Sequence, residues 1–416
     1  MPPTPNSIAT VGSWLSMEIM REMTNALEIA PYFNTSYNSE LTKDFPIGTS
    51  FQVPFPKQFV ATNSLAYTPQ PIIDRTTTVT VDQVSSVHFD YDSVEKALKL
   101  PRGEDRLRQT LIRPAVNTIR QDIESRAALY AYLNTPNVVG VLGTNPSSFD
   151  TVYGAAGQRL AELGYTGDLA MFLPPSVIRP LRNSAVSYFN PSADLTAMWK
   201  KGTIGEANGF ETYQVNSLYS HTAGTWAGTV EVLAAGQSGA TLSLTATTGD
   251  TFKPGDVFNI AGVYEVNRWT RRSTGTLKQF TVGGTATVTA ASSAATIPII
   301  PSIIGPGSPY QNVDALPAAG ADLTLFPGTS SPNGKTGTQG LAMGRDAFAL
   351  VGVRLPQPKE GTVEITSQSR DPRTGISIAI IRDFDPILRR WVNRIDTLYG
   401  FGNLYNDMAA VRVLSA

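Results

Sequence analysis

The sequence predicts an α+β protein whose main body is interrupted by an inserted all-β domain. Apolar residues recur every four positions over residues 103–134, the pattern of one long helix. Around that helix, short segments alternate between strand and helix patterns. Residues 224–344 differ from both, because they hold 18 of the 35 glycines and only 12 charged residues. Their short alternating runs of Thr, Ala and Val are typical of a β-barrel or sandwich.

Composition excludes most catalytic chemistry. The 416 residues suffice for two or three domains, and the net charge is −1, from 33 Lys plus Arg against 34 Asp plus Glu. A dedicated nucleic-acid grip normally has a basic excess, which is missing here. Cysteine is absent and there are two histidines, so thiolate metal sites and most His-based sites are excluded. We therefore expect no catalytic residue, no metal and no cofactor.

The N-terminal residues predict a helix over 13–30 that Pro31 ends. It either packs on its own domain or forms an arm that reaches a neighbouring molecule. The sequence has neither a basic region followed by an apolar run, as in a secretory signal, nor an apolar stretch long enough to span a bilayer. We expect a soluble protein with no membrane contact.

An extended apolar segment follows at residues 45–73, in which five prolines disfavour a central strand. Two runs, 50–55 and 58–67, could form a hairpin, but a lone hairpin is marginal in water. The segment is therefore either a surface loop folded on its own domain or an arm that contacts a neighbour. The apolar side chains available for such a contact are Phe51, Val53, Phe55, Phe59 and Tyr67.

Residues 76–91 alternate apolar and polar side chains and predict a half-exposed strand. In the long helix that follows, arginines occupy the sides left free by the apolar stripe. Three of them form a candidate basic face: Arg106, Arg113 and Arg120. A solvated face paired with Glu104, Asp122 and Glu124 explains these arginines at least as well.

The remaining body is mixed. Strand and helix patterns continue at 137–142 (strand), 150–163 (helix), 169–173 (strand) and 175–182 (helix). Strands return after the glycine-rich region at 362–366, 376–382, 390–399 and 410–414. The simplest topology is one α+β body with the β domain inserted into it.

The catalytic motifs are near misses. Residues 236–240 lack the last glycine of a nucleophile elbow, and no histidine follows position 221. Residues 328–336 end in Gly-Lys-Thr, but the first glycine is one residue too far away for a phosphate loop. Asp371, Asp383 and Asp385 could be paired carboxylates of a glycosidase, but turns at 371–375 and 383–386 explain them better.

One local pattern is more specific. The run 252–267, FKPGDVFNIAGVYEVN, is followed over 270–282 by TRRSTGTLKQFTV. It resembles the inserted β domain of the P22-type major capsid proteins of tailed bacteriophages. The closing runs 394–400 and 410–413 are similar to the last strands of the same family. Physically, the run predicts two apolar strands joined by an exposed basic tip that carries Arg268, Arg271, Arg272 and Lys278.

The resemblance implies the HK97-like capsid fold over the whole chain. Its parts would be an N-terminal arm (1–44), an extended loop (E-loop, 45–75), a peripheral domain (76–138) with its spine helix (103–134), an axial domain (139–223), the inserted β domain (224–344) and a return to the axial and peripheral domains (345–416).

The resemblance also implies a function and partners. The protein would be the major capsid protein, self-assembling as hexamers and pentamers of an icosahedral shell around scaffolding protein, with a portal at one vertex. The shell would mature as double-stranded DNA enters without sequence-specific binding, and assembly would occur in the host bacterial cytoplasm. The tip arginines and Lys278, with the E-loop side chains, are the candidate contacts between subunits. Two alternatives are another phage structural β protein, of the tail or of capsid decoration, and, less favoured, a carboxylate-dependent glycosidase.

Overall fold

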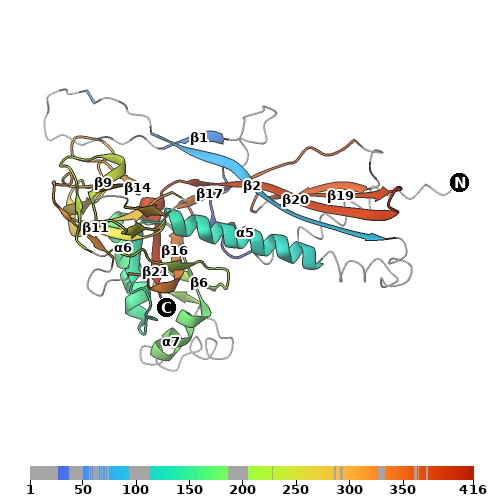
Figure 1. Ribbon diagram of the computed structural model, residues 1–416, viewed down its shortest axis with the longest axis horizontal. Coiled ribbons are helices and arrows are strands. Elements are labelled where there is room, and N and C mark those ends of the chain that lie inside the picture. The colour runs from blue at the N-terminus through green and yellow to red at the C-terminus, as the bar shows by residue number, and fades with distance from the viewer. Residues whose placement is uncertain are drawn as a thin grey trace. The chain divides into compact units, whose positions relative to one another are not determined.

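A computed structural model gives the fold (Figure 1). The chain divides into two compact units, each built from segments far apart in sequence. Unit 1 comprises residues 1–53, 78–127 and 348–402, and unit 2 comprises residues 54–77, 128–347 and 403–416. The structure describes residues 27–36, 50–55, 57, 59, 65, 67, 69–70, 72, 75–92, 113–185, 205–226, 228–284, 287–290, 294–326, 333–359, 363, 365–371 and 373–416.

A sheet of long antiparallel strands forms most of unit 1 (Figure 1). Its order is β1 (Ser50–Pro54), β2 (Thr76–Asp92), β20 (Arg390–Asn403), β19 (Ser377–Asp385) and β18 (Ile365–Arg370), with β17 (Phe348–Val353) also paired to β20. Along β2 the side chains alternate, since Val79, Ser85 and Tyr91 are buried while Val84 is exposed. The predicted half-exposed strand is confirmed, and it ends one residue later than expected.

Helix α5 (Arg113–Asn134) contains the predicted apolar stripe. The buried apolar side chains of α5 are Ala115, Val116, Ile119, Ile123, Ala127, Ala128, Ala131 and Tyr132. The expected first part of the helix, 103–112, lies outside the described residues. The part of α5 up to Ala127 belongs to unit 1 and lies on its sheet. There Ser85 of β2 hydrogen-bonds Asp122, and Gln83 accepts a hydrogen bond of 2.8 Å from Arg126.

The segment 27–36 also packs within unit 1. Buried Glu124 of α5 accepts hydrogen bonds of 2.9–3.3 Å from the backbone N–H groups of Glu28, Ile29 and Ala30. A single 3₁₀ turn, η1 (Ala30–Tyr32), follows, so residues 27–29 are not the helix end that the sequence predicts. This part of the expected arm therefore folds on its own unit. Residues 1–26 lie outside the described residues.

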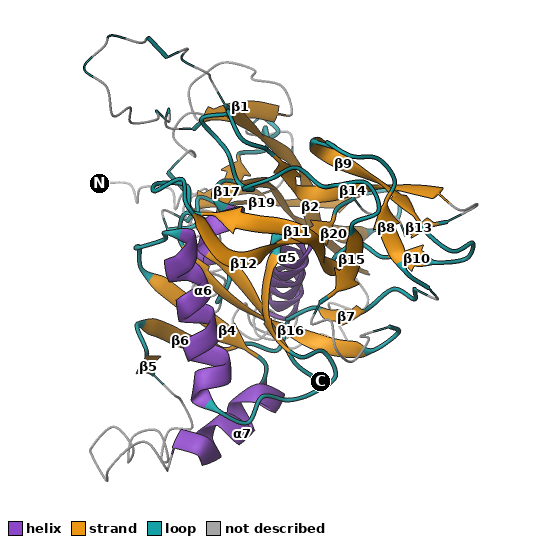
Figure 2. Ribbon diagram, turned by 90° about the vertical axis from the view of Figure 1, so that its left-hand side faces the viewer, coloured by secondary structure: helices purple, strands orange, loops and turns teal. Residues whose placement is uncertain are grey.

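Unit 2 contains a seven-stranded sheet (Figure 2). Its order is β3 (Asn137–Gly140), β21 (Ala410–Leu414), β16 (Thr336–Gly344), β4 (Leu169–Leu173), β6 (Phe210–Gln214) and β5 (Glu206–Ala207), with β7 (Ser220–Thr222) on β16. Three helical segments accompany it: the turn η3 (Asp150–Gly154), α6 (Ala155–Leu163) and α7 (Pro175–Ala185). Leu160, Phe210 and Val411 share one buried cluster, so α6 packs against the sheet. Gly164 ends α6 in the left-handed conformation (φ 85°), as predicted.

Unit 2 also contains a closed six-stranded barrel. Its strands are β11 (Val257–Val266), β12 (Ser273–Val282), β14 (Ala294–Ile303), β9 (Gly239–Thr245), β8 (Val230–Val232) and β15 (Asp322–Leu325). A small pair, β10 (Thr251–Phe252) and β13 (Val288–Thr289), accompanies it. The expected β domain was 224–344, but β16 pairs with β21 and β4 instead. The barrel itself therefore lies within 230–325.

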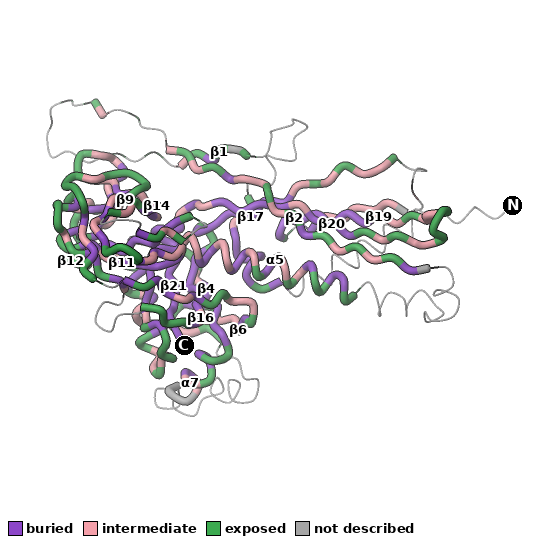
Figure 3. Tube along the Cα trace, viewed as in Figure 1, coloured by how far each residue is buried: buried purple, intermediate pink, exposed green. Residues whose placement is uncertain are grey.

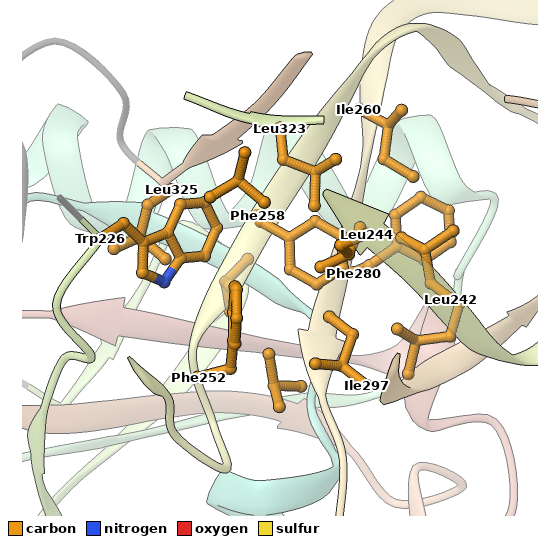
Figure 4. Close-up of a cluster of buried hydrophobic side chains, with 14 of the residues drawn as sticks. Trp226, Leu242, Leu244, Phe252, Phe258, Ile260, Phe280, Ile297, Leu323 and Leu325 are labelled. Atoms are coloured by element: carbon orange, nitrogen blue, oxygen red, sulfur yellow. The ribbon is translucent and has the colours of Figure 1, made fainter. Parts of the chain in front are cut away.

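Aromatic and branched side chains fill the barrel. In Figure 4 the rings of Phe258 and Phe280 lie among Leu242, Leu244 and Ile297, and each of the five is fully buried. The two rings stack with centroids 6.0 Å apart. This core is continuous with Val138 and Leu414 of the adjoining sheet and with Leu142, which follows β3. In the described part of the chain, no helix is long and apolar enough to cross a lipid bilayer.

We expect Phe258→Ala to lower the free energy of unfolding by about 3–5 kcal/mol, because it removes a fully buried ring from this core. Guanidinium denaturation of the full chain measures the change. The matched variant Tyr264→Ala removes a ring that is 39% exposed from the same strand and should cost about 1 kcal/mol or less. Equal losses in the two variants would contradict the barrel core.

Candidate functional site

The loop between β11 and β12, residues 267–272, is built around one asparagine. The Asn267 side-chain oxygen accepts hydrogen bonds from the backbone N–H groups of Trp269 and Thr270, at 3.0 and 3.1 Å. Its amide group donates to the carbonyl oxygen of Glu162 at the end of α6. Arg271 adopts a left-handed backbone with φ 57°. These bonds hold the loop in one conformation next to α6.

Arg268 is turned inward from this loop. Its guanidinium forms an ion pair of 2.7 Å with Asp407 of the short helix α9 (Asn406–Ala409), and both side chains are 9% exposed. Burial opposes the ionised form of Asp407, but the positive charges of Arg268, Lys278 and Arg75 outweigh it and hold the Asp407 pKa below its usual range. The prediction that Arg268 is an exposed contact residue is therefore wrong.

Lys278 is buried as well. It lies in β12 and is 2% exposed, and its ammonium group forms a 2.5 Å ion pair with buried Glu265 of β11. Glu265 also pairs at 2.6 Å with Arg159 of α6. Lys278 thus belongs to a buried Arg159–Glu265–Lys278 triad, and the prediction that it lies on an exposed tip is wrong. The sequence could not show this, because the charge that faces Lys278 comes from the opposite strand.

The other two arginines of the loop differ from each other. The Arg271 guanidinium donates to the carbonyl oxygens of Ser308, at 2.9 Å, and Pro309. Burial is the larger cause, and the charge of Arg268 the smaller, of a lowered Arg271 pKa. Arg272 is exposed. Of the predicted basic tip, Arg272 alone keeps the expected exposure.

A second polar cluster attaches the start of β11 to the seven-stranded sheet. Asp256 accepts a 2.8 Å hydrogen bond from the His221 ring, and the other ring nitrogen of His221 bonds to the Tyr132 hydroxyl. Buried Arg412 of β21 donates to the Gly255 carbonyl oxygen at 2.9 Å, and its guanidinium lies 5.0 Å from the Tyr132 ring centroid. Burial lowers the Arg412 pKa to about 10. Burial also raises the pKa of the Tyr132 hydroxyl above its usual value.

Gly255 is required at this position. Its φ is +93°, and a Cβ atom there would lie 2.0 Å from the Tyr132 hydroxyl. Gly255 and Asp256 lie in the run 252–267 that the sequence singled out, but the sequence did not show that they meet Tyr132, His221 and Arg412. These contacts join the start of β11 to Tyr132 of α5, to His221 of β7 and to Arg412 of β21, so the arrangement acts as a structural clamp.

Comparison with known proteins identifies the family to which the chain belongs. A sequence profile described as P22 coat protein, gene protein 5, matches residues 49–414. The chain belongs to the P22 coat protein family. Its function is that of a major capsid protein, which associates with copies of itself to form a phage shell and is found in the virion capsid. The family is structural, which fits a non-enzymatic role.

Several solved structures of phage capsid proteins match this coat protein at low sequence identity. A structure from Mycobacterium phage Che8 is 13% identical, with a TM-score of 0.47, and the match covers 93% of this chain and 90% of the other. A capsid of Cyanophage P-SCSP1u is 10% identical, with a TM-score of 0.44 and coverages of 89% and 84%. The CUS-3 coat protein I-domain is 26% identical, with a TM-score of 0.19, over 24% of this chain and 95% of its own. No curated protein matches the sequence.

The predicted fold class and function of the coat protein are confirmed. The α+β fold with an inserted β-barrel, expected from the resemblance to HK97-like capsid proteins, agrees with the family match and with the strands described above. Two of the carboxylates that the alternative assignment to a glycosidase requires, Asp371 and Asp385, have a structural role in turns. Asp371 accepts hydrogen bonds from the backbone of Arg373 and Thr374, and Asp385 accepts them from Ile387 and Leu388, as turn residues do.

The E-loop residues of the coat protein fall into two groups. Val53 of β1 is 3% exposed, and the Phe55 ring packs edge-on against Tyr405 with centroids 5.3 Å apart. Val53 is thus buried and Phe55 half-buried, so neither has the exposure that the sequence argument assumed for a contact residue. Phe59 and Tyr67 are 60% and 92% exposed, as a contact would require. The side chain of Phe51 lies outside the described residues.

Two further residues of the E-loop are exposed and are not among those predicted from the sequence. Leu65 is 108% and Ile72 62% exposed. In the basic face of the spine helix, Arg113 is exposed and Arg120 half-buried, while Arg106 lies outside the described residues. The described residues contain no group of three or more His, Asp or Glu side chains that could hold a metal ion.

We expect Asp407→Asn to flatten the acid branch of the stability profile. The folded pKa of Asp407 lies below its unfolded value of about 3.9, so its stabilisation is complete above that pH and is lost as pH falls through the folded pKa. The wild-type free energy of unfolding should therefore fall more steeply below about pH 4 than that of the variant.

The same variant should lose about 3–5 kcal/mol at pH 7, because Arg268 is left buried without its partner. Asp322→Asn, which changes an exposed carboxylate of β15, is the control and should resemble wild type. Chemical denaturation at several pH values measures all three proteins. Identical acid slopes for wild type and Asp407→Asn would contradict the ion pair.

Proposed function

We propose that the coat protein assembles into an icosahedral shell of hexamers and pentamers through its E-loop and through the loop of the inserted barrel. Assembly takes place around scaffolding protein in the host bacterial cytoplasm, with a portal protein at one vertex. The shell then expands as double-stranded DNA enters. A net charge of −1 supports enclosure of DNA without sequence-specific binding.

The domain roles belong to the same proposal. Residues 1–44 act as the N-terminal arm and 45–75 as the E-loop, while 76–138, with spine helix 103–134, form the peripheral domain. Residues 139–223 form the axial domain, the return 345–416 contributes to both the axial and the peripheral domains, and the insertion lies within 224–344. The seven-stranded sheet, which joins β3, β4 and β6 to β16 and β21, supports one axial body built from both sides of the insertion.

The observation that carries the proposal is the exposure of apolar side chains along the E-loop. Phe59, Leu65, Tyr67 and Ile72 are each at least 60% exposed. Large apolar side chains gathered in one exposed segment indicate an interaction site. Covering each of them contributes about 1.5–3 kcal/mol. A neighbouring subunit supplies that cover, so the E-loop favours association without stabilising the free subunit.

The barrel loop adds a weaker contact. Arg272 is exposed and sits on a loop that Asn267 and the buried partners of Arg268 hold in place. An exposed ion pair contributes about 0–1 kcal/mol. A carboxylate of a neighbour that meets Arg272 therefore guides assembly and still permits wrong contacts to dissociate.

We expect Phe59→Ser with Tyr67→Ser to leave the free subunit as stable as wild type, within about 0.5 kcal/mol, because both side chains are already exposed. Shell formation should fall about tenfold or more, because each contact loses two apolar side chains. Sedimentation and electron microscopy of co-expressed coat and scaffolding proteins measure the yield. Leu233→Ser, at a barrel residue that is 50% exposed, is the control; equal yields from the two variants would refute the E-loop contact.

Charge reversal at Arg272 and at Arg271 should affect shell assembly and stability differently. Arg272→Glu should preserve thermal stability and lower the yield of shells, because it reverses an exposed charge. Arg271→Glu should lower the melting temperature instead, because it removes two hydrogen bonds to the 308–309 carbonyls. Calorimetry and particle yield separate the two effects. Normal shells from Arg272→Glu, and from the variant that combines Arg271→Glu with Arg272→Glu, would contradict a contact at this loop.

A further inference from the structure

Unit 2 contains a cavity of about 320 Å³ beside the barrel loop that no contact described above uses. Phe55, Tyr310 and Tyr405 form aromatic walls, with Met408 among the apolar lining, and Trp269 and Thr166 also line it. Trp269 is 67% exposed and Thr166 is exposed, whereas Tyr310 and Met408 are 5% and 7% exposed. The cavity is therefore an aromatic recess that opens to solvent, large enough to take one or two apolar side chains.

The charged side chains that line this recess are Lys57, Arg75, Arg268 and Asp346, so cations outnumber carboxylates there. The Arg75 guanidinium lies 5.1 Å from the Phe55 ring centroid and 5.7 Å from that of Tyr310. Asp407 attracts it, but the carboxylate of Asp407 already pairs with Arg268. Within the described ranges, the guanidinium of Arg75 forms no hydrogen bond or ion pair, although it is half-buried. A half-buried guanidinium that stacks on rings and has donors to spare fits a carboxylate.

The chain itself carries a segment with the complementary chemistry. Strands β19 and β20 pair as far as Asp385 and Arg390, so a narrow four-residue turn joins them. In that turn Ile387 is 89% and Leu388 56% exposed; they are the only two consecutive large apolar residues that are exposed in the described chain. The end of the β19–β20 hairpin is exposed (Figure 3). Asp383 of β19 is exposed as well, and Arg390 pairs with Asp90 at 2.8 Å.

We propose that the recess binds the β19–β20 turn of a second copy of this chain, with Ile387 and Leu388 against the aromatic walls and the Asp383 carboxylate on Arg75. The inference rests on the proposed assembly through contacts between subunits. It adds a specific pair of surfaces, a protruding turn and a recess, to the E-loop contact. Stacking on Phe55 and Tyr310 orients the guanidinium in advance, so few side-chain motions are lost on binding.

Engineered cysteines test this pairing without background, because the chain has none. Thr166→Cys places a thiol at the recess and Ile387→Cys places one on the turn. In shells assembled from the full-length double variant, mild oxidation should give cross-linked dimers and larger multimers on a denaturing gel, at least about tenfold above the control pair Thr166→Cys with Val84→Cys. Val84 is 50% exposed on β2.

The outcomes are distinct. Shells that form with no more cross-linking than the control would overturn the inference and leave the proposed assembly intact. A cross-link already formed within free subunits would also overturn it, because the occupant would then be the chain's own turn. Failure of the wild-type protein to form shells with its scaffolding protein would instead contradict the proposed function.

A charge exchange gives a second measurement. Arg75→Glu and Asp383→Arg should each lower the yield of shells about tenfold, and the combined variant should recover most of that yield, because the pair is restored with its charges exchanged. Asp322→Arg, which reverses an exposed acidic side chain of β15 away from the recess lining, is the matched control. A combined variant no better than the poorer single variant would contradict the pairing, and the cross-link decides the case if Arg75→Glu fails to fold.

Discussion

The buried carboxylate of Glu265 is the constraint on which the barrel loop depends. It lies between Lys278 of β12 and Arg159 of α6, at 2.5 and 2.6 Å, with all three side chains shielded from water. A charge buried without its partners costs several kcal/mol. If the β11–β12 hairpin moved away from α6, these ion pairs would break while their charges were still shielded from water. The buried charges therefore hold the hairpin against α6. The nearby Arg268–Asp407 pair adds a second such connection, from the loop to α9.

The cluster at the start of β11 completes this attachment. Asp256 binds His221 and the backbone N–H groups of Gly224 and Lys253, so it ties the entry of the insertion to the turn before β11. Arg412 then joins that turn to β21, the last strand of the chain. Within unit 2 the barrel is thus held at the base of its β11–β12 hairpin and at the tip. A barrel inserted through a simple linker would leave its loop free, whereas here the buried charges fix where the loop points.

The sequence predicted the helices and strands that depend on the spacing of neighbouring residues. It did not predict the burial of side chains whose contacts come from distant parts of the chain. The stripe of α5, the alternation in β2 and the strands β4 and β21 follow from the spacing of neighbouring residues. The bounds of these three strands and the end of α5 agree with the prediction within a few residues. The burial of Lys278 and Arg268 could not be predicted, because Arg268 meets a carboxylate 139 positions away. Val53 and Phe55 were grouped with the exposed apolar residues for the same reason: composition shows apolar character but not which side chains find cover in the same chain.

The free subunit therefore pairs its buried charges internally, whereas the apolar side chains of its E-loop stay exposed until a neighbouring subunit covers them. Hydroxyl-radical footprinting of side chains, on free subunits and on assembled shells, measures this difference directly. The account predicts strong oxidation of Phe59, Leu65, Tyr67 and Ile72 in free subunits and a several-fold loss in shells, while buried Phe258 and Phe280 stay protected in both. Equal oxidation of the four E-loop residues in the two states would contradict it.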